Sequence, residues 1–221
     1  MDLAELSSGL YAFPQTIVHE GTEYTYHPAA AETPRGLALL DVGHPNAVEQ
    51  VESHLENRGY GWDDVSAVVV THQDNDHAGG LAQIADRIDA PVYAHERAAP
   101  HVDGREPLLD YDAERYPPVD VEIVDGVRFR TGAGPMEVVF TPGHAPGHVS
   151  LYFPDADLLV AADALAAPDG ELVLPKVADE DDARDSVARL ADLDFERTLC
   201  YHGGLVEAGT DRVRELAESL R

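Results

Sequence analysis

The sequence predicts an α/β fold, and three observations support this prediction. Short apolar runs of strand length alternate with longer stretches of helical periodicity along the 221 residues. Each half of the chain is rich in strands first and then becomes helical. Histidine and aspartate recur where apolar strands end, and in layered α/β folds such ends gather at one rim of a sheet. The sequence therefore predicts a layered fold with a site at its strand ends.

The first half begins with strands. Residues 3–18 and 23–42 alternate or run apolar, with turn residues between them, which predicts a β-meander. A helix is expected at 45–58, with Gly59 as its stop. The next elements are a strand, a helix and a strand, expected at 65–71, 78–88 and 91–95.

The second half repeats this order. Its strands are expected at 121–124, 127–130, 136–140, 149–153 and 158–162. A helix at 180–193, a strand ending at Tyr201 and a helix at 210–220 close the chain. No low-complexity linker divides the halves, and 44% hydrophobic residues suffice for one good core. We therefore predict a single domain over residues 1–221.

Composition limits the partners. The formal net charge is -27, with 42 acidic and 15 basic residues, and Lys176 is the single lysine. Acidic residues occur in almost every segment, which is typical of a protein from an extreme halophile, where strong salt screens self-repulsion. The chain shows no basic stripe for nucleic acid or anionic membrane, so a small-molecule substrate is expected. The oligomeric state is left open.

The expected location of the protein and the state of its cysteine follow from three features of the sequence. No stretch approaches the roughly 20 apolar residues that span a bilayer. The acidic N-terminus lacks the basic and apolar regions of a signal peptide, so a cytoplasmic protein is expected. A single cysteine, Cys200, excludes an internal disulfide and is expected in the core.

The run from Thr71 to His77 is the clearest functional signal. Four side chains that bind metals well fall within six positions: His72, Asp74, Asp76 and His77. Crowded carboxylates repel one another, whereas a divalent cation favours neutral imidazole and ionised carboxylate together. The alternative is a solvated polar loop after a strand. A metal site is the stronger interpretation, because ligand residues recur at the ends of other apolar runs. His144 stands in a Pro-Gly turn after one such run, and Asp163 and His202 stand at the ends of two more.

The segments His72–His77, Thr141–His144, Asp163 and His202 resemble the metal signature of the metallo-β-lactamase superfamily. The resemblance covers nearly the whole chain and implies a four-layer αββα sandwich. It implies that one metal takes His72, the residue at position 74 and His144. A second metal would take Asp76, His77 and His202, with Asp163 bridging. Asp41 resembles an aspartate that ends an early strand of the family, and His148 is implied to brace a ligand or the loop.

Asp74 departs from the family pattern, which has histidine at this position. An aspartate oxygen can ligate at a similar distance, but it makes the site harder and favours iron or manganese. We expect two divalent metal ions, with zinc first and iron or manganese second. His44 is expected at a pocket rim or at the start of a surface helix. The remaining histidines carry no pattern and are expected at the surface: His19, His27, His54, His95 and His101.

The resemblance implies a hydrolase in which metal ions lower the pKa of a bound water to about 7, so that hydroxide forms at neutral pH. Asp76 and Asp163 are the expected catalytic residues, positioning this hydroxide and moving its proton. An ester or thioester hydrolase of the hydroxyacylglutathione-hydrolase type is the first expectation. The alternatives are a lactonase, a phosphodiesterase or nuclease, a di-iron oxidoreductase-like protein, and a metal-binding module without activity.

The irregular stretch 101–120 is expected to select the substrate. It is charged and rich in aromatic residues, and such a long loop in a compact domain is typically functional or disordered. Four of its side chains are candidates for holding an anionic substrate: Arg105, Tyr111, Arg115 and Tyr116. A solvated surface loop is the alternative.

Overall fold

A computed structural model describes residues 4–107 and 118–221 of the chain. These residues form two compact units, and each is described by itself. The first unit is Met1–Ile123 with Thr131–Ala133, and the second is Val124–Arg130 with Gly134–Arg221. That the whole chain acts as one domain stays a prediction.

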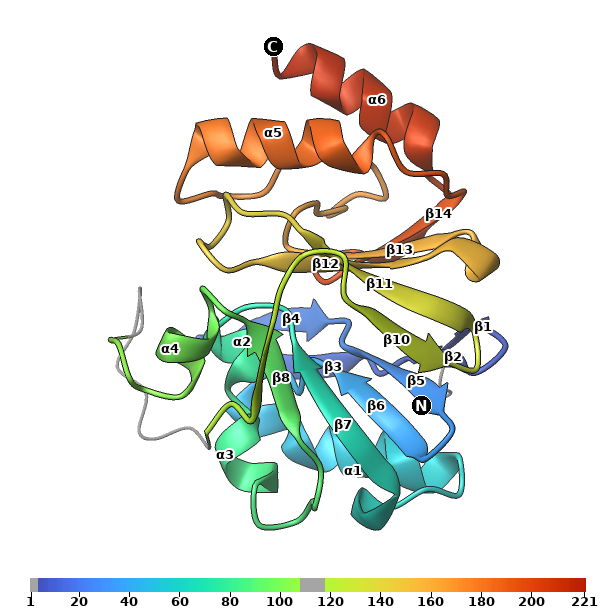
Figure 1. The fold of residues 1–221 in the computed structure, drawn as a ribbon, viewed down its shortest axis with the longest axis vertical. Coiled ribbons are helices and arrows are strands. Elements are labelled where there is room, and N and C mark those ends of the chain that lie inside the picture. The colour runs from blue at the N-terminus through green and yellow to red at the C-terminus, as the bar shows by residue number, and fades with distance from the viewer. Residues whose placement is uncertain (1–3, 108–117) are drawn as a thin grey trace. The chain divides into compact units, whose positions relative to one another are not determined.

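The first unit contains a mixed sheet of seven strands among its described residues, in the order β1-β2-β5-β6-β7-β8-β9 (Figure 1). The strands are β1 (Ala4–Ser7), β2 (Leu10–Ala12), β5 (Ala29–Thr33), β6 (Gly36–Leu40), β7 (Val65–Val70), β8 (Val92–His95) and β9 (Val121–Ile123). The last four run parallel, so their carboxyl ends lie along one edge of the sheet.

Helix α1 (Val48–Asn57) and the short helix α3 (Leu81–Ile84) contribute to the core of the first unit. The apolar residues Val51 and Leu55 of α1 lie one turn apart on one face and are buried. They belong to the same apolar cluster as Val68 of β7, which is fully buried. A strand buried in this way reads as a continuous apolar run, as the sequence Val65–Val70 does.

Strands β3 (Gln15–His19) and β4 (Thr22–Tyr26) form a separate antiparallel hairpin in the first unit. Its two-residue turn, Glu20-Gly21, has positive φ angles of 50° and 82°. Such turns match the right-handed twist of the strands they join. Much of this hairpin is exposed, and Val18 retains 70% of its accessible surface.

The prediction of a single helix at 78–88 is wrong. Two short helices stand there instead, α2 (Asn75–Ala78) and α3, joined by Gly79 and Gly80. A Cβ atom on Gly80 would lie 2.6 Å from the side chain of Val42. The close approach of the loop after β6 therefore interrupts the helical pattern. The first of the two helices, α2, begins within the metal-ligand run.

The second unit contains a six-stranded sheet in the order β10-β11-β12-β13-β14-β15. Its strands are β10 (Arg128–Thr131), β11 (Gly134–Phe140), β12 (Val149–Phe153), β13 (Leu158–Ala162), β14 (Arg197–Cys200) and β15 (Gly204–Val206), of which β15 was not predicted. Helices α5 (Glu180–Leu190) and α6 (Thr210–Ser219) pack on this sheet through Val187 and Val213.

The remaining short elements are α4 (Ala99–Val102) and three 3-10 turns at 45–47, 62–64 and 154–156. Among the described residues, no helix has the length and apolar character that crossing a membrane requires.

The prediction that His54 and His95 lie at the surface is wrong, because they retain only 3% and 4% of their accessible surface. The sequence shows no charge partner for either residue, but tertiary contacts bury both. His54 stacks on Phe13, and its Nε2 donates to the carbonyl of Pro14 at 2.8 Å. Its Nδ1 has no hydrogen-bond partner among the described residues.

Burial lowers the pKa of His54, although its hydrogen bond to Pro14 opposes this effect. The unfolded chain therefore binds a proton near its ordinary pKa of about 6.5, whereas the folded chain binds it only at lower pH. Stability should be full above that pH and should fall as the pH drops below it. We expect wild type to lose roughly 1 kcal/mol more than His54→Gln between about pH 7.5 and pH 5, measured by urea unfolding. Equal losses in the two proteins would contradict this.

Candidate metal centre

In the first unit, Asp41 organises the residues around the end of β7. It follows β6, retains only 3% of its accessible surface, and has a left-handed φ of 63°. Its Oδ1 accepts the backbone N–H of Thr71 at 2.7 Å, and its Oδ2 accepts the Thr71 hydroxyl at 2.7 Å. Oδ2 also lies 2.8 Å from Nδ1 of His77. A buried carboxylate is stable here because it has these donors.

This network sets which nitrogen of each histidine carries the proton. Nδ1–H of His77 donates to Asp41, so Nε2 of His77 holds the lone pair. The Thr71 hydroxyl donates its one proton to Asp41, so at 3.1 Å it accepts from Nδ1–H of His72. Nε2 of His72 then also holds a lone pair. Both rings are fully buried, and their centroids are 4.0 Å apart. Neutral imidazoles fixed in this way are suited to metal ligation.

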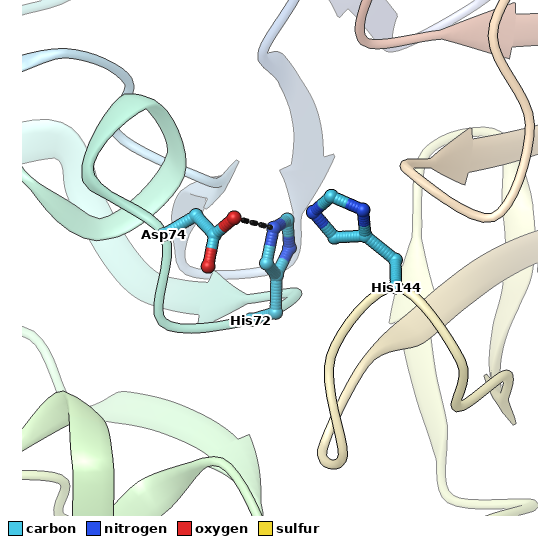
Figure 2. Close-up of side chains that lie close together, drawn as sticks. All are labelled: His72, Asp74 and His144. Atoms are coloured by element: carbon cyan, nitrogen blue, oxygen red, sulfur yellow. Dashed lines mark ion pairs between the residues drawn. The ribbon is translucent and has the colours of Figure 1, made fainter. Parts of the chain in front are cut away.

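Asp74 lies beside His72 in the same loop (Figure 2). One carboxylate oxygen, Oδ2, is 3.5 Å from Nε2 of His72, and the other accepts the side-chain amide of Gln73 at 2.9 Å. The aspartate therefore points toward the imidazole rather than away from it. Asp76 belongs to α2 and lines a pocket of the first unit. That Asp74 and Asp76 are metal ligands stays a prediction.

In the second unit, His144, Asp163 and His202 come together from three loops that follow β11, β13 and β14. Nε2 of His144 is 3.5 Å from Oδ2 of Asp163, and Nε2 of His202 is 3.2 Å from the same oxygen. Nδ1–H of His144 donates to the carbonyl of Lys176 at 2.8 Å, which leaves the lone pair on Nε2. Two imidazole nitrogens thus face one carboxylate oxygen.

His144 depends on the glycine before it. Gly143 has a φ of 132°, and a Cβ atom there would lie 2.5 Å from the backbone of Ala183 in α5. The carbonyl of Gly143 accepts the backbone N–H groups of Ala178 and Asp179 at the start of that helix. Any larger residue would strain this turn and separate it from α5.

His148 braces the same end of the second sheet. Its Nδ1–H donates to the carbonyl of Thr141 at 3.0 Å, so its Nε2 accepts the backbone N–H of Asp163 at 3.0 Å. His148 is fully buried. It therefore links the loop that carries His144 to the residue at the end of β13. Ala162, just before Asp163, has a φ of 47°, which is an unfavourable value for a residue with a side chain.

Sequence reasoning missed the hydroxyl groups of Thr71 and Thr141. Each contacts a histidine near the end of a strand, at 3.1 Å from His72 and 2.9 Å from His148. Threonine is common in strands, so neither stood out from its apolar run. Cys200 is buried as expected, and burial, with the charge of Asp163, raises the pKa of its thiol.

Of the four candidate substrate residues, the structure describes Arg105. Tyr111, Arg115 and Tyr116 lie outside the described residues. Arg105 is exposed and pairs with Asp103 at 2.8 Å and with Glu122 at 2.6 Å. Hydrogen bonds to these two carboxylates raise the pKa of Arg105. Its charge is therefore already neutralised by the chain's own acids. That it holds a substrate stays a prediction.

The model of the family described as Metallo-beta-lactamase superfamily matches residues 30–202. The chain belongs to this superfamily. It is 29% identical over 205 residues to the Bacillus subtilis (strain 168) protein named Probable metallo-hydrolase YflN, covering 77% of this chain and 76% of that protein. A crystal structure of a metallo-beta-lactamase family protein from Thermus thermophilus superimposes with a TM-score of 0.76 at 27% identity, covering 98% of this chain and 79% of that one. The predicted fold class is thereby confirmed.

A Ruegeria pomeroyi protein named Hydroxyacylglutathione hydrolase is 33% identical over 144 residues, or 65% of this chain. The chain spans only 48% of that protein's length, and 38% of its counterpart from Cereibacter sphaeroides. These relatives support a hydrolase as the class of enzyme. They leave the substrate open.

Replacing Asp74 tests its role as a ligand. Asp74→Ala should lower the metal content and reduce hydrolysis, because an oxygen facing His72 is removed. Asp74→His should retain metal and shift preference toward zinc over iron or manganese, since a nitrogen replaces a hard oxygen. Metal content after reconstitution with each ion measures both effects. Metal content unchanged in Asp74→Ala would contradict the assignment.

Proposed function

We propose that this protein is a metal-dependent hydrolase that acts on a carboxylic ester or thioester. Superfamily membership and relatives named as hydrolases support the proposal. One observation carries it. In the second unit, Nε2 of His144 and Nε2 of His202 lie within 3.5 Å of the same oxygen of Asp163. Such a donor set is suited to holding a divalent cation.

The residues of each unit fit the expected metals. In the first unit, the Thr71–Asp41 network leaves lone pairs on Nε2 of His72 and His77. By the superfamily pattern, these two histidines, Asp74, Asp76 and the three residues of the second unit hold up to two ions. The donor set is nitrogen and oxygen without sulfur, which suits zinc first and iron or manganese second.

The metal ions and the residues of the chain would supply different parts of the chemistry. When bound, divalent ions supply a water acidic enough to ionise near neutral pH. The carboxylates of Asp76 and Asp163 would help to hold the ions, and they are the chain's own groups that could orient a water and accept a proton. Asp41 and Thr71 hold the rings of His72 and His77, and His148 holds the loop that carries His144. These contacts fix the imidazoles, so that their geometry is kept as charge develops.

Metal analysis and a substrate panel test the proposal. Protein purified in molar salt is reconstituted separately with zinc, iron(II) and manganese, and its metal content is measured. Each form is assayed with an ester, a thioester, a lactone and a phosphodiester, alongside Asp163→Ala as a control for contaminating hydrolases. Ester or thioester turnover that needs Asp163 supports the proposal. Turnover of the lactone or phosphodiester alone would replace the substrate class, and no metal-dependent turnover would overturn the activity.

A further inference from the structure

Helix α5 lies across one face of the second sheet (Figure 1), and its side chains hold the segment that leads to His144. The hydroxyl of Ser186 donates to the carbonyl of Pro142 at 2.6 Å. One guanidinium nitrogen of Arg189, Nη1, donates to the carbonyl of Phe140 at 3.3 Å. Ser186 and Arg189 are three residues apart and therefore lie on the same side of the helix. The helix thus binds alternate carbonyls of the segment between β11 and His144.

The backbone of Phe140, the last residue of β11, is held by two side chains. Earlier in the strand, the N–H and carbonyl of Val138 bond to backbone groups of the turn at 126–127, both at 2.8 Å. At Phe140, side chains bind instead. Oδ1 of Asp125 accepts the N–H of Phe140 at 2.8 Å, and Arg189 donates to its carbonyl. Backbone groups at a strand end need such partners, so this pair fixes where β11 ends.

Asp125 and Arg189 also bind each other. Nη2 of Arg189 donates to Oδ2 of Asp125, which closes a ring of hydrogen bonds around the backbone of Phe140. The planar guanidinium presents its donors in fixed directions, and a lysine ammonium does not. The two side chains are 46% and 40% exposed, so their charge attraction alone contributes little to stability. What they supply is the geometry of the strand end.

The strand end is coupled to His144, which follows Phe140 by four positions. Proline at 142 restricts the backbone between them, and Gly143 packs against α5 where no side chain fits. The carbonyl of Gly143 and Nδ1–H of His144 both bond to the segment just before α5. A displacement of Phe140 would therefore move the ring of His144, whose Nε2 faces Asp163.

We propose that Asp125 and Arg189 are positioning residues of the metal centre, which act together by fixing the end of β11 and so the direction of Nε2 of His144. This inference rests on the metal dependence of the proposed function. Neither residue belongs to the expected ligand set or contacts one of its side chains in the hydrogen bonds that hold Phe140. Groups that orient a metal-binding histidine typically change metal affinity by about 10- to 100-fold when they are removed.

Cobalt(II) is the probe, because its visible absorption reports the geometry of its ligands. Arg189→Gln should weaken cobalt(II) binding by about tenfold, measured by competition with a chelator, and should alter the absorption spectrum. Asp125→Asn should have a similar effect, since its amide presents a donor to Arg189 in place of an acceptor. Arg189→Lys should recover part of the affinity, because it keeps the charge and one direction of donation. The double variant should lose little more than Arg189→Gln alone, as expected for residues that act as one unit.

Two controls separate positioning from general loss of stability. Arg184→Gln removes an exposed arginine of the same helix, whose partners Glu180 and Asp181 also belong to α5. Val213→Ala creates a cavity beneath α6 and lowers stability without contacting the His144 segment. Both variants should bind cobalt(II) as wild type does, with an unchanged spectrum, at a temperature where circular dichroism shows every variant to be folded.

The cobalt(II) measurements stand apart from the proposed activity. If no ester or thioester is hydrolysed while Arg189→Gln weakens cobalt(II) binding and changes the spectrum, the activity fails and the positioning role stands. Affinity and spectrum of Arg189→Gln equal to those of wild type would overturn the inference. An equal loss of affinity in Val213→Ala, or a wild type that binds no cobalt(II), would overturn it as well.

Discussion

Replacing Asp163 with alanine is expected to reduce hydrolysis by roughly a thousandfold or more, since metal-assisted charge stabilisation is worth several kcal/mol. Asp163 is buried, and its Oδ2 faces Nε2 of both His144 and His202. Removing the carboxylate leaves two imidazoles without their shared acidic partner. The loss should appear in kcat and in metal content, measured by elemental analysis after reconstitution.

The fold should survive this substitution. The backbone N–H of Asp163, not its side chain, donates to His148, so the brace between β11 and β13 remains. Asp163→Asn, which keeps the shape but lowers the donor strength, should retain more metal than Asp163→Ala. Asp169→Ala, at an exposed position, is the matched control and should behave as wild type. Full activity in Asp163→Ala would refute the proposed site.

Thermal stability should rise steeply with salt, and we expect this to be the largest effect of solution conditions. The formal charge of -27 destabilises the compact state by self-repulsion, and salt shortens the Debye length from about 30 Å at 0.01 M to about 3 Å at 1 M. Each kcal/mol of repulsion removed raises the Tm by about 2–4 °C for a chain of this size. Melting in potassium chloride from about 0.01 M to 3 M measures the effect, where screening predicts most of the gain below about 1 M.

A variant with fewer charges separates screening from other effects of salt. Glu23, Glu207 and Glu218 are exposed, and replacing all three with glutamine removes three negative charges. The variant should melt higher than wild type at low salt and at nearly the same temperature at high salt. A Tm that is independent of salt in both proteins would contradict the proposed adaptation to strong salt.

Local patterns were enough to locate the metal-ligand candidates. His72, Asp74, Asp76 and His77 are adjacent in sequence, and the apolar run before them becomes the buried strand β7. His144 lies after a similar run, in a turn where Gly143 approaches α5 too closely for a side chain. Such signals are short-range, because a strand and the turn that ends it are encoded within a few residues.

Long-range packing decided what the patterns did not show. The helical periodicity of residues 78–88 is interrupted at Gly79 and Gly80, where the loop containing Val42 packs against the chain. Contacts from Phe13 and Pro14 bury His54. In both cases the deciding partner is far away along the chain, and no periodicity within a local window reports it.

The sequence by itself determined the fold class, the acidic character and the identity of the metal-ligand candidates, because strand-length apolar runs and clustered ligand residues are local properties of the chain. The tertiary structure alone decided how those candidates are oriented. Asp41 reaches Thr71 and His77 across 30 and 36 residues, and so fixes which imidazole nitrogens hold lone pairs. It also decided how the β3–β4 hairpin is joined to α1, since Gln50 bonds to Thr16, 34 residues away.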